Sequence, residues 1–218
     1  NGQEKTKEST QEHSQAADTD VNETANAVSG WIGDEYPYEQ ELQIVDDNYR
    51  NYYEIFVYSY CDSNGDKIGD LNGITSKLEY IRDLGYTGIW LTPIFTSSSL
   101  HKYNASSYYE IDASFGTLED FDKLILKAHA LGIKVILDLA INHSSKNASY
   151  FQKAVEAHKK KINFSSLNDE EKKYQDFYVF YDTEDQAKQS RKTYYKVPNC
   201  NFYYEANFDS DMPEFNFD

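Results

Sequence analysis

Polar side chains that could do chemistry end the short apolar run IKVILDLAINH, residues 133–143. Asp138, Asn142 and His143 supply a carboxylate, an amide and an imidazole there. The β-branched stretch Ile133–Asp138 predicts a strand buried on both faces, and parallel α/β sheets place their active sites at the C-terminal ends of such strands. An Asp that closes a strand also commonly caps the next turn. The run therefore indicates a candidate site, with capping as the alternative.

A second set of polar groups stands at near-alternate positions in CDSNGDKIGDLNG. Its oxygen donors are Asp62, Asn64, Asp66, Ile68 through its backbone carbonyl, and Asp70. Oxygen ligands two residues apart around tight turns are what a hard cation such as Ca²⁺ requires. An EF-hand is excluded, because Lys67 and Gly73 occupy the positions of its glycine and its bidentate Glu. The segment predicts a calcium site, with a solvated acidic turn as the alternative.

A long polar loop, residues 96–117, follows the second predicted strand and contains a group of ring and amide side chains: His101, Tyr103, Asn104, Tyr108 and Tyr109. It is too long for an ordinary strand-to-helix connection, and such loops commonly carry function. Tyrosine rings are amphipathic and can stack on a sugar face, although ordinary packing explains most tyrosines. We therefore treat this loop as part of the candidate site.

Composition limits the partners of the chain. A formal charge of −16 over 218 residues disfavours nucleic acid and anionic membrane surfaces as partners and favours neutral or cationic ligands. The 39% hydrophobic content is enough for a core. No apolar run is long enough to span a membrane. Cys61 and Cys200 allow at most one disulfide, and the sequence leaves that pairing open.

The first 23 residues are rich in Glu, Gln, Ser, Thr and Asp and predict a disordered acidic tether. Because the chain does not begin with Met, either a targeting segment was removed or the sequence is an excerpt. Such tethers often follow a signal peptide or an upstream lipid anchor. We therefore expect an extracellular or cell-surface protein.

The elements that would position these groups alternate between strand and helix. Strands are expected at Tyr53–Tyr60, Gly88–Leu91 and Ile133–Asp138. One helix face, Ile74 to Leu84, ends at Gly85, and a second helix from Leu118 to Leu131 ends at Gly132. Thr117 and Asp120 are spaced as a capping box, and a further helix is expected over Tyr150–His158. This alternation predicts repeating β/α units in a parallel sheet.

Five segments, YEIFVYSYCDSNGDKIGDLNGI, GYTGIWLTPIF, IDASFGT, DLAINH and MPEFN, resemble, in the same order, those of the alpha-amylase family of glycoside hydrolases. The resemblance extends from Tyr53 to Asp218. It implies an α/β fold, the first three units of an incomplete (β/α)₈ TIM barrel, with an irregular domain B inserted after strand three. The expected divisions are a tether and lead-in at 1–50, barrel at 51–143 and domain B at 144–218.

The resemblance also implies roles for single residues. The Asp62–Asp70 loop would be the family's calcium loop, Tyr103 would stack on the sugar at the cleavage subsite, and His143 would contact that sugar. The implied substrate-binding set is Tyr103, His143, Asp138, His101 and Asn104. Asn142 and Glu214 would hold a second metal or anchor domain B. Asn104 replaces a carboxylate found in some members, and Glu214 replaces the Asp of an MPDLN motif typical of the group between neopullulanases and oligo-glucosidases.

Retaining glycosidases need a nucleophile and an acid about 5 Å apart. The family carries these carboxylates after strands four and five, so we expect them beyond Asp218 and no catalytic residue in this chain. The predicted function is the N-terminal part of a retaining alpha-glucan hydrolase acting on α-1,4 and, in some members, α-1,6 bonds, with this fragment itself inactive. The alternatives are a non-catalytic glucan-binding or transporter-associated relative and an unrelated calcium-stabilised α/β domain.

Overall fold

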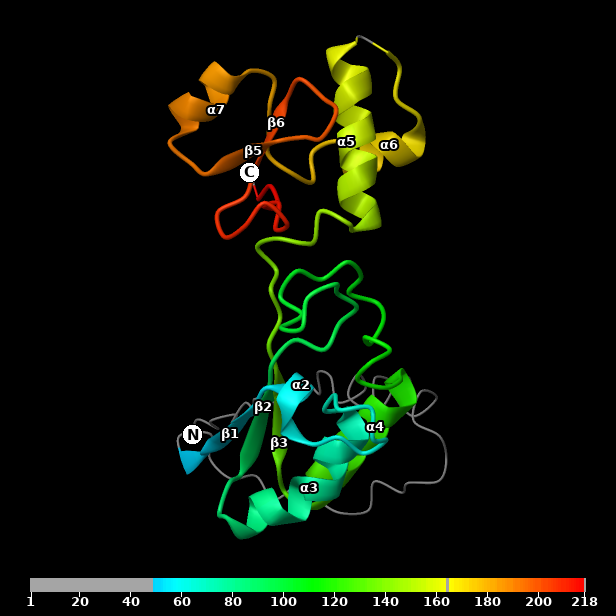
Figure 1. Ribbon diagram of the computed structural model, residues 1–218, viewed down its shortest axis with the longest axis vertical. Coiled ribbons are helices and arrows are strands. Elements are labelled where there is room, and N and C mark those ends of the chain that lie inside the picture. The colour runs from blue at the N-terminus through cyan, green and yellow to red at the C-terminus, as the bar shows by residue number, and fades with distance from the viewer. Residues whose placement is uncertain (1–48, 164, 218) are drawn as a thin grey trace, which may run out of the picture. The chain divides into compact units, whose positions relative to one another are not determined.

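The computed structural model describes residues 49–163 and 165–217, so almost all of the predicted tether and lead-in lies outside the described residues. The first described part is a three-stranded parallel sheet in the order β1-β2-β3 (Figure 1). The strands are β1 Tyr52–Ile55, β2 Gly88–Leu91 and β3 Lys134–Leu137. The predicted bounds of the second strand are confirmed, and three parallel strands are what the first part of a β/α barrel requires.

Two helices connect these strands as predicted, α3 Leu71–Asp83 and α4 Leu118–Ala130. Thr117 and Asp120 form the predicted capping box at the start of α4. After each helix a glycine adopts a left-handed conformation, with φ +90° at Gly85 and +72° at Gly132. Residues with a Cβ rarely adopt this conformation, and it ends the helix.

Both helices pack on one face of the sheet. Leu78 and Leu124 are fully buried in one cluster with Ile89 and Leu91. The opposite face is open, because Trp90 and its neighbour in register, Ile136, are 42% and 40% exposed. The prediction that Ile133–Asp138 is buried on both faces is therefore wrong for the described residues. The prediction of a strand in this apolar run is confirmed, but in the described residues helices cover only one of its faces.

The strand predicted over Tyr53–Tyr60 is also too long. It ends at Ile55, and α2 Val57–Tyr60 is a short helix. The hydroxyl of Thr92 accepts the Val57 N–H at 3.3 Å, and the Tyr58 carbonyl accepts the Gly69 N–H at 2.7 Å. These bonds to distant segments replace strand pairing and turn the chain into the acidic loop.

Residues 144–217 build a second core around a small antiparallel sheet of order β4-β6-β5 (Figure 1). The elements are α5 Ser149–Ile162, α6 Asp169–Tyr174, β4 Phe180–Tyr181, α7 Glu184–Ser190, β5 Tyr194–Lys196 and β6 Tyr203–Glu205. The predicted helix over Tyr150–His158 lies within α5. Phe151, Tyr178, Phe202 and Tyr204 are buried together, so much of the aromatic content of this segment is core. Cys61 and Cys200 both carry free thiols.

Candidate functional site

Three of the predicted site residues meet at the C-terminal end of β3. The Tyr103 hydroxyl donates to Asp138 Oδ2 at 2.6 Å, and His143 Nε2 lies 3.1 Å from the Tyr103 carbonyl oxygen. His101 joins through Nδ1, which accepts the Tyr103 N–H at 3.1 Å. Tyr103 is thus held by its ring end and by its backbone. The long loop and the end of β3 form one cluster, as the sequence predicts for parallel strands.

His143 is 4% exposed, and burial lowers the pKa of its imidazole, an effect opposed by the Tyr103 carbonyl and by Glu214. A carbonyl oxygen can only accept a hydrogen bond, so Nε2 carries the proton. In the neutral ring Nδ1 is then a bare acceptor, and this buried atom has no hydrogen-bond partner among the described residues. An unpaired buried acceptor is costly. A hydroxyl donor from a ligand would satisfy it.

Tyr103 is kept neutral by its surroundings. Its hydrogen bond to Asp138, together with burial, raises the pKa of the phenol to about 12. It therefore donates to Asp138 throughout the physiological range, and its ring lies 5.8 Å from that of His101. Phe208, which the sequence analysis did not single out, lies 5.2 Å from the His143 ring and is 68% exposed. An exposed aromatic ring beside a buried His gives the cluster an apolar rim.

The Asn104 side chain reaches this cluster through Ser99, whose hydroxyl also lies 3.2 Å from His101 Nδ1. The Asn104 side chain is turned into the loop, where Oδ1 accepts from the hydroxyls of Ser97, at 2.6 Å, and Ser99. The residue is only 4% exposed. Its observed contacts shape the loop that carries Tyr103, and its contact with substrate stays a prediction.

The loop is also supported by a buried ion pair that sequence reasoning missed. Lys102 Nζ lies 2.8 Å from Asp112 Oδ2, with side-chain exposures of 8% and 11%. The ammonium group also donates to the Ser97 carbonyl at 3.2 Å and lies 5.1 Å from the centre of the Phe115 ring. Asp112 belongs to the IDASFGT segment, which was the only sequence clue to it. This pair ties the first part of the loop to its IDASFGT segment.

Asn142 and Glu214 lie on paired segments where the second core begins and ends. His143 and Glu214 form an antiparallel bridge, and the Phe215 N–H donates to the Asn142 carbonyl at 2.9 Å. The Glu214 carboxylate accepts the Asn207 N–H at 3.3 Å. These bonds anchor the segment through its backbone, and metal binding by either side chain stays a prediction.

The acidic loop is a series of side-chain-capped turns. Asp62 Oδ1 accepts the Gly65 N–H at 2.6 Å, Asn64 Oδ1 accepts the Asp66 N–H at 2.8 Å, and Asp66 Oδ1 accepts the Ile68 N–H at 2.7 Å. The backbone donors of Gly65 and Lys67 lower the pKa of Asp62. Asp70 is buried and caps α3 by accepting from Gly73 at 2.7 Å. The donor types fit a hard cation, but nowhere in residues 49–163 and 165–217 do three His, Cys, Asp or Glu side chains gather around one point.

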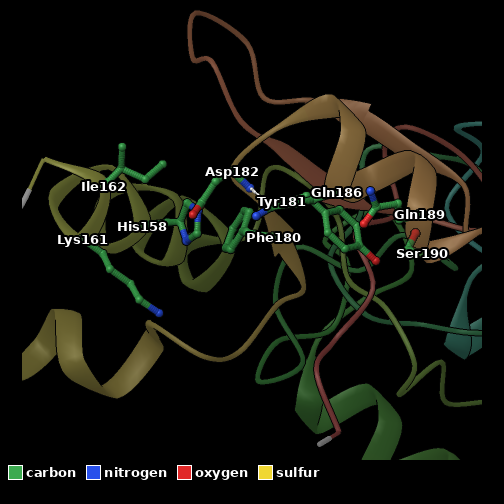
Figure 2. Close-up of a pocket in the computed structure, with 9 residues that line it drawn as sticks. All are labelled: His158, Lys161, Ile162, Phe180, Tyr181, Asp182, Gln186, Gln189 and Ser190. Carbon is green, nitrogen blue, oxygen red and sulfur yellow. Dashed lines mark hydrogen bonds and ion pairs between the residues drawn. The ribbon is translucent and has the colours of Figure 1, made fainter.

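A separate hollow of about 780 Å³ lies among residues of the second core (Figure 2). Lys161 and Ile162 lie on one side of it, and Gln189 and Ser190 lie on the other. In it, His158 Nε2 lies 2.8 Å from Asp182 Oδ1. None of the predicted site residues lines this hollow. It is therefore distinct from the cluster around His143.

His158 should make the free energy of unfolding decrease as the pH is lowered. Burial lowers its pKa below the usual 6.5; Lys161 adds to this and Asp182 opposes it. Below pH 6.5 the unfolded chain binds the proton first, so the free energy of unfolding decreases as the pH falls. His129 and His143 act in the same direction. Urea unfolding at pH 7.5 and pH 5.5 should show a smaller loss for His158→Gln than for the unmodified protein, and an equal loss would contradict this assignment.

Comparison with known proteins shows which family and which relatives the chain is similar to. The alpha-amylase family, described as alpha amylase, catalytic domain, matches residues 54–217. Alpha-amylase 3 of Dictyoglomus thermophilum is 44% identical over 172 residues, which cover 78% of this chain and 31% of that protein. The oligo-1,6-glucosidase of Heyndrickxia coagulans is 42% identical over 131 residues, covering 60% of this chain and 21% of that protein. Among solved structures, Eubacterium rectale Amy13B superposes with a TM-score of 0.71 at 42% identity, covering 81% of this chain and 33% of that one.

This chain therefore spans between about a fifth and a third of the length of these relatives. The match begins in β1 and includes the acidic loop, the Tyr103 loop, the His143 segment and the second core. The three parallel strands agree with the barrel expected from the sequence, of which they are a part.

Proposed function

Because this chain belongs to the alpha-amylase family, we propose that it is part of an alpha-glucan hydrolase that cleaves α-1,4 bonds of starch or maltooligosaccharides with retention. The single observation that carries the proposal is the Tyr103–Asp138–His143 cluster. It offers a sugar an oriented ring, a carboxylate and a bare imidazole acceptor on one side of the sheet end. These groups would bind and orient the sugar. The covalent step needs two further carboxylates, which we do not place in this chain.

His143 and Tyr103 would act on one sugar residue from two directions. His143 Nδ1 would accept a hydrogen bond from a sugar hydroxyl, because Nε2–H is already used on the Tyr103 carbonyl. The Tyr103 ring would stack on the pyranose, held in place by its bond to Asp138. Fixed groups of this kind favour a flattened, charged transition state over a flexible ground state.

The proposal is tested with the whole protein and maltoheptaose. Proton NMR of the first products should show the α-anomer before mutarotation, as retention requires. Cleavage with the β-anomer appearing first would overturn the mechanism. Binding without any cleavage would favour the alternative of a non-catalytic glucan-binding or transporter-associated relative. Activity on isomaltose or panose would extend the proposal to α-1,6 bonds, for which the similarity to an oligo-1,6-glucosidase is the support.

We also propose that the acidic loop binds Ca²⁺ through Asp62, Asn64, Asp66, the Ile68 carbonyl and Asp70. The oxygen donors and their spacing support this, and the Asp62 and Asp66 side chains are exposed. A bound cation would relieve repulsion between the carboxylates and hold the turn between β1 and α3. Its role would be structural.

Removing calcium should therefore lower the melting temperature of the whole protein. A cation at a hundred times its Kd stabilises the folded form by about 2.7 kcal/mol. Asp66→Ala should reduce the shift caused by chelator, while Asp83→Ala, which removes an exposed carboxylate at the end of α3, should leave it unchanged. The measurement is thermal unfolding with and without chelator after verified removal of metal. No shift in the unmodified protein would make the loop an acidic turn only.

We propose an extracellular or cell-surface location, with secretion or a lipid anchor, on the support of the acidic, polar first 23 residues. Within the part of the chain that the structure describes, no helix is long and apolar enough to cross a membrane. Fractionation of cells that produce the whole protein, with detection in the medium or envelope, would test the location. Detection in the cytosol alone would contradict it.

A further inference from the structure

A second hollow, of about 360 Å³, lies between the loop after β2 and the start of α5. Its lining consists of four tyrosines, two phenylalanines, three serines and one lysine. Pockets of roughly 300 to 1,000 Å³ are typical of sites for small ligands. None of the residues that line it belongs to the cluster around His143. The hollow therefore calls for an explanation of its own.

One of the residues that line this hollow, Tyr150, carries a polar atom without a partner in the described residues. The hydroxyl of Tyr150 is buried and makes no hydrogen bond in the described residues. Two neighbouring phenols are satisfied, because Tyr108 reaches the Ala140 and His143 carbonyls at 2.7 Å and Tyr178 lies 2.6 Å from Ser144 Oγ. A buried hydroxyl without a partner is destabilising unless a ligand or water meets it. The unpaired Tyr150 hydroxyl is thus a second, independent sign of an occupant.

Aromatic rings line the hollow or lie at its rim. Tyr109 is 91% exposed and Phe177 is 38% exposed, and both are among the lining residues. The Tyr150 ring stacks parallel to that of Tyr108, with an interplanar angle of 15° and centres 6.4 Å apart. Large exposed rings around a hollow are a typical surface for flat, amphipathic partners.

The chemistry of the lining selects a neutral, hydroxyl-rich ligand. No carboxylate lines the hollow, and Lys173 is its single charged residue, 5.3 Å from the centre of the Tyr174 ring. An anion would meet only this one lysine on a protein of charge −16. A purely apolar ligand would leave the Tyr150 hydroxyl unpaired, whereas Ser106 Oγ already donates to the Thr96 carbonyl at 3.0 Å and Ser107 Oγ accepts the Tyr109 N–H at 3.3 Å. Rings with hydroxyl donors and acceptors fit a sugar.

We propose that this hollow is a second carbohydrate-binding site, which takes one or two pyranose units of an oligosaccharide away from the site of cleavage. A sugar stacks on Tyr109 and accepts or donates a hydrogen bond at the Tyr150 hydroxyl. Tyr108 connects the two sites, because its ring lines the hollow while its hydroxyl bonds the His143 carbonyl. The inference concerns binding only and does not depend on hydrolysis.

The test uses the whole protein and methyl 4-thio-α-maltoside, a maltose analogue that glycosidases cleave poorly. Calorimetric titration should show two binding events, one of which is weakened about tenfold by Tyr109→Ala, which removes an exposed ring. Tyr150→Phe, which deletes only the unpaired hydroxyl, should weaken the same event about threefold to tenfold, as the loss of one hydrogen bond does. Tyr80→Ala, an exposed tyrosine on α3, is the matched control and should weaken neither event.

Folding and hydrolysis are measured alongside. Tyr150→Phe should melt no lower than the unmodified protein, because it removes a polar group that lacks a partner in the free state. A single binding event, or two events that both variants leave unchanged, would overturn the inference and show that the hollow holds water only. If neither the unmodified protein nor any of the variants hydrolyses maltoheptaose, but the second binding event is intact, the proposed function is overturned and the proposed binding site is retained.

Discussion

Replacing His143 with Asn should lower kcat of the whole protein by about tenfold to a thousandfold, equivalent to about 1.4 to 4 kcal/mol of transition-state stabilisation. His143 is 4% exposed, its Nε2 bonds the Tyr103 carbonyl, and its Nδ1, which has no hydrogen-bond partner among the described residues, would accept from a sugar under the proposed function. Asn is shorter and cannot reach both partners at once. KM should rise by a smaller factor, because a rigid acceptor contributes most when the sugar is distorted.

Two further variants separate a catalytic role from a structural one. His129→Asn removes a partly buried histidine of α4 whose pKa is also lowered by burial, and it should leave kcat unchanged. Tyr103→Phe keeps the ring but removes the 2.6 Å bond to Asp138, so kcat should fall by less than in His143→Asn. The measurements are steady-state kinetics on maltoheptaose and thermal unfolding. Unchanged kcat with a lower melting temperature in His143→Asn would make this residue a structural cap.

Breaking the Lys102–Asp112 pair should have the largest effect on stability. Lys102→Met keeps most of the side-chain length but leaves the Asp112 carboxylate buried without its cation, which typically costs about 3 to 5 kcal/mol. Asp112 would keep its bonds to Ser97 and Ser114, and these limit the loss. The free energy of unfolding from urea titration measures the effect. The surface pair Lys123–Glu119 is the control, and Lys123→Met should cost at most about 1 kcal/mol.

A double variant sharpens this prediction. Lys102→Met with Asp112→Leu removes both charges, and it should recover much of the stability lost in Lys102→Met alone, because no unpaired charge remains. If Lys102→Met alone is as stable as the unmodified protein, the Asp112 carboxylate is solvated once the lysine is removed. The same loop carries Tyr103, so a loss of loop order should also lower kcat.

The sequence by itself determined the local features of this fold. The bounds of β2, the Thr117–Asp120 capping box and the helix ends at Gly85 and Gly132 all follow from short-range rules about apolar runs, side-chain caps and left-handed glycine. The order of the five matching segments also identified the family and, with it, the barrel. The strand bounds, the capping box and the helix ends each depend on residues within a few positions of one another.

Only the tertiary structure decided which polar groups meet and which remain unpaired. Tyr103 reaches Asp138 across 35 residues and His143 across 40, so no local pattern could show that Asn104 turns inward while Tyr103 turns to the site. The same holds for α2, which forms because Thr92 and Gly69 take backbone groups that a strand would have used. Burial of Ile136 also depends on which sheet face the helices cover. These outcomes depend on contacts between distant segments, and a linear sequence pattern records only neighbours.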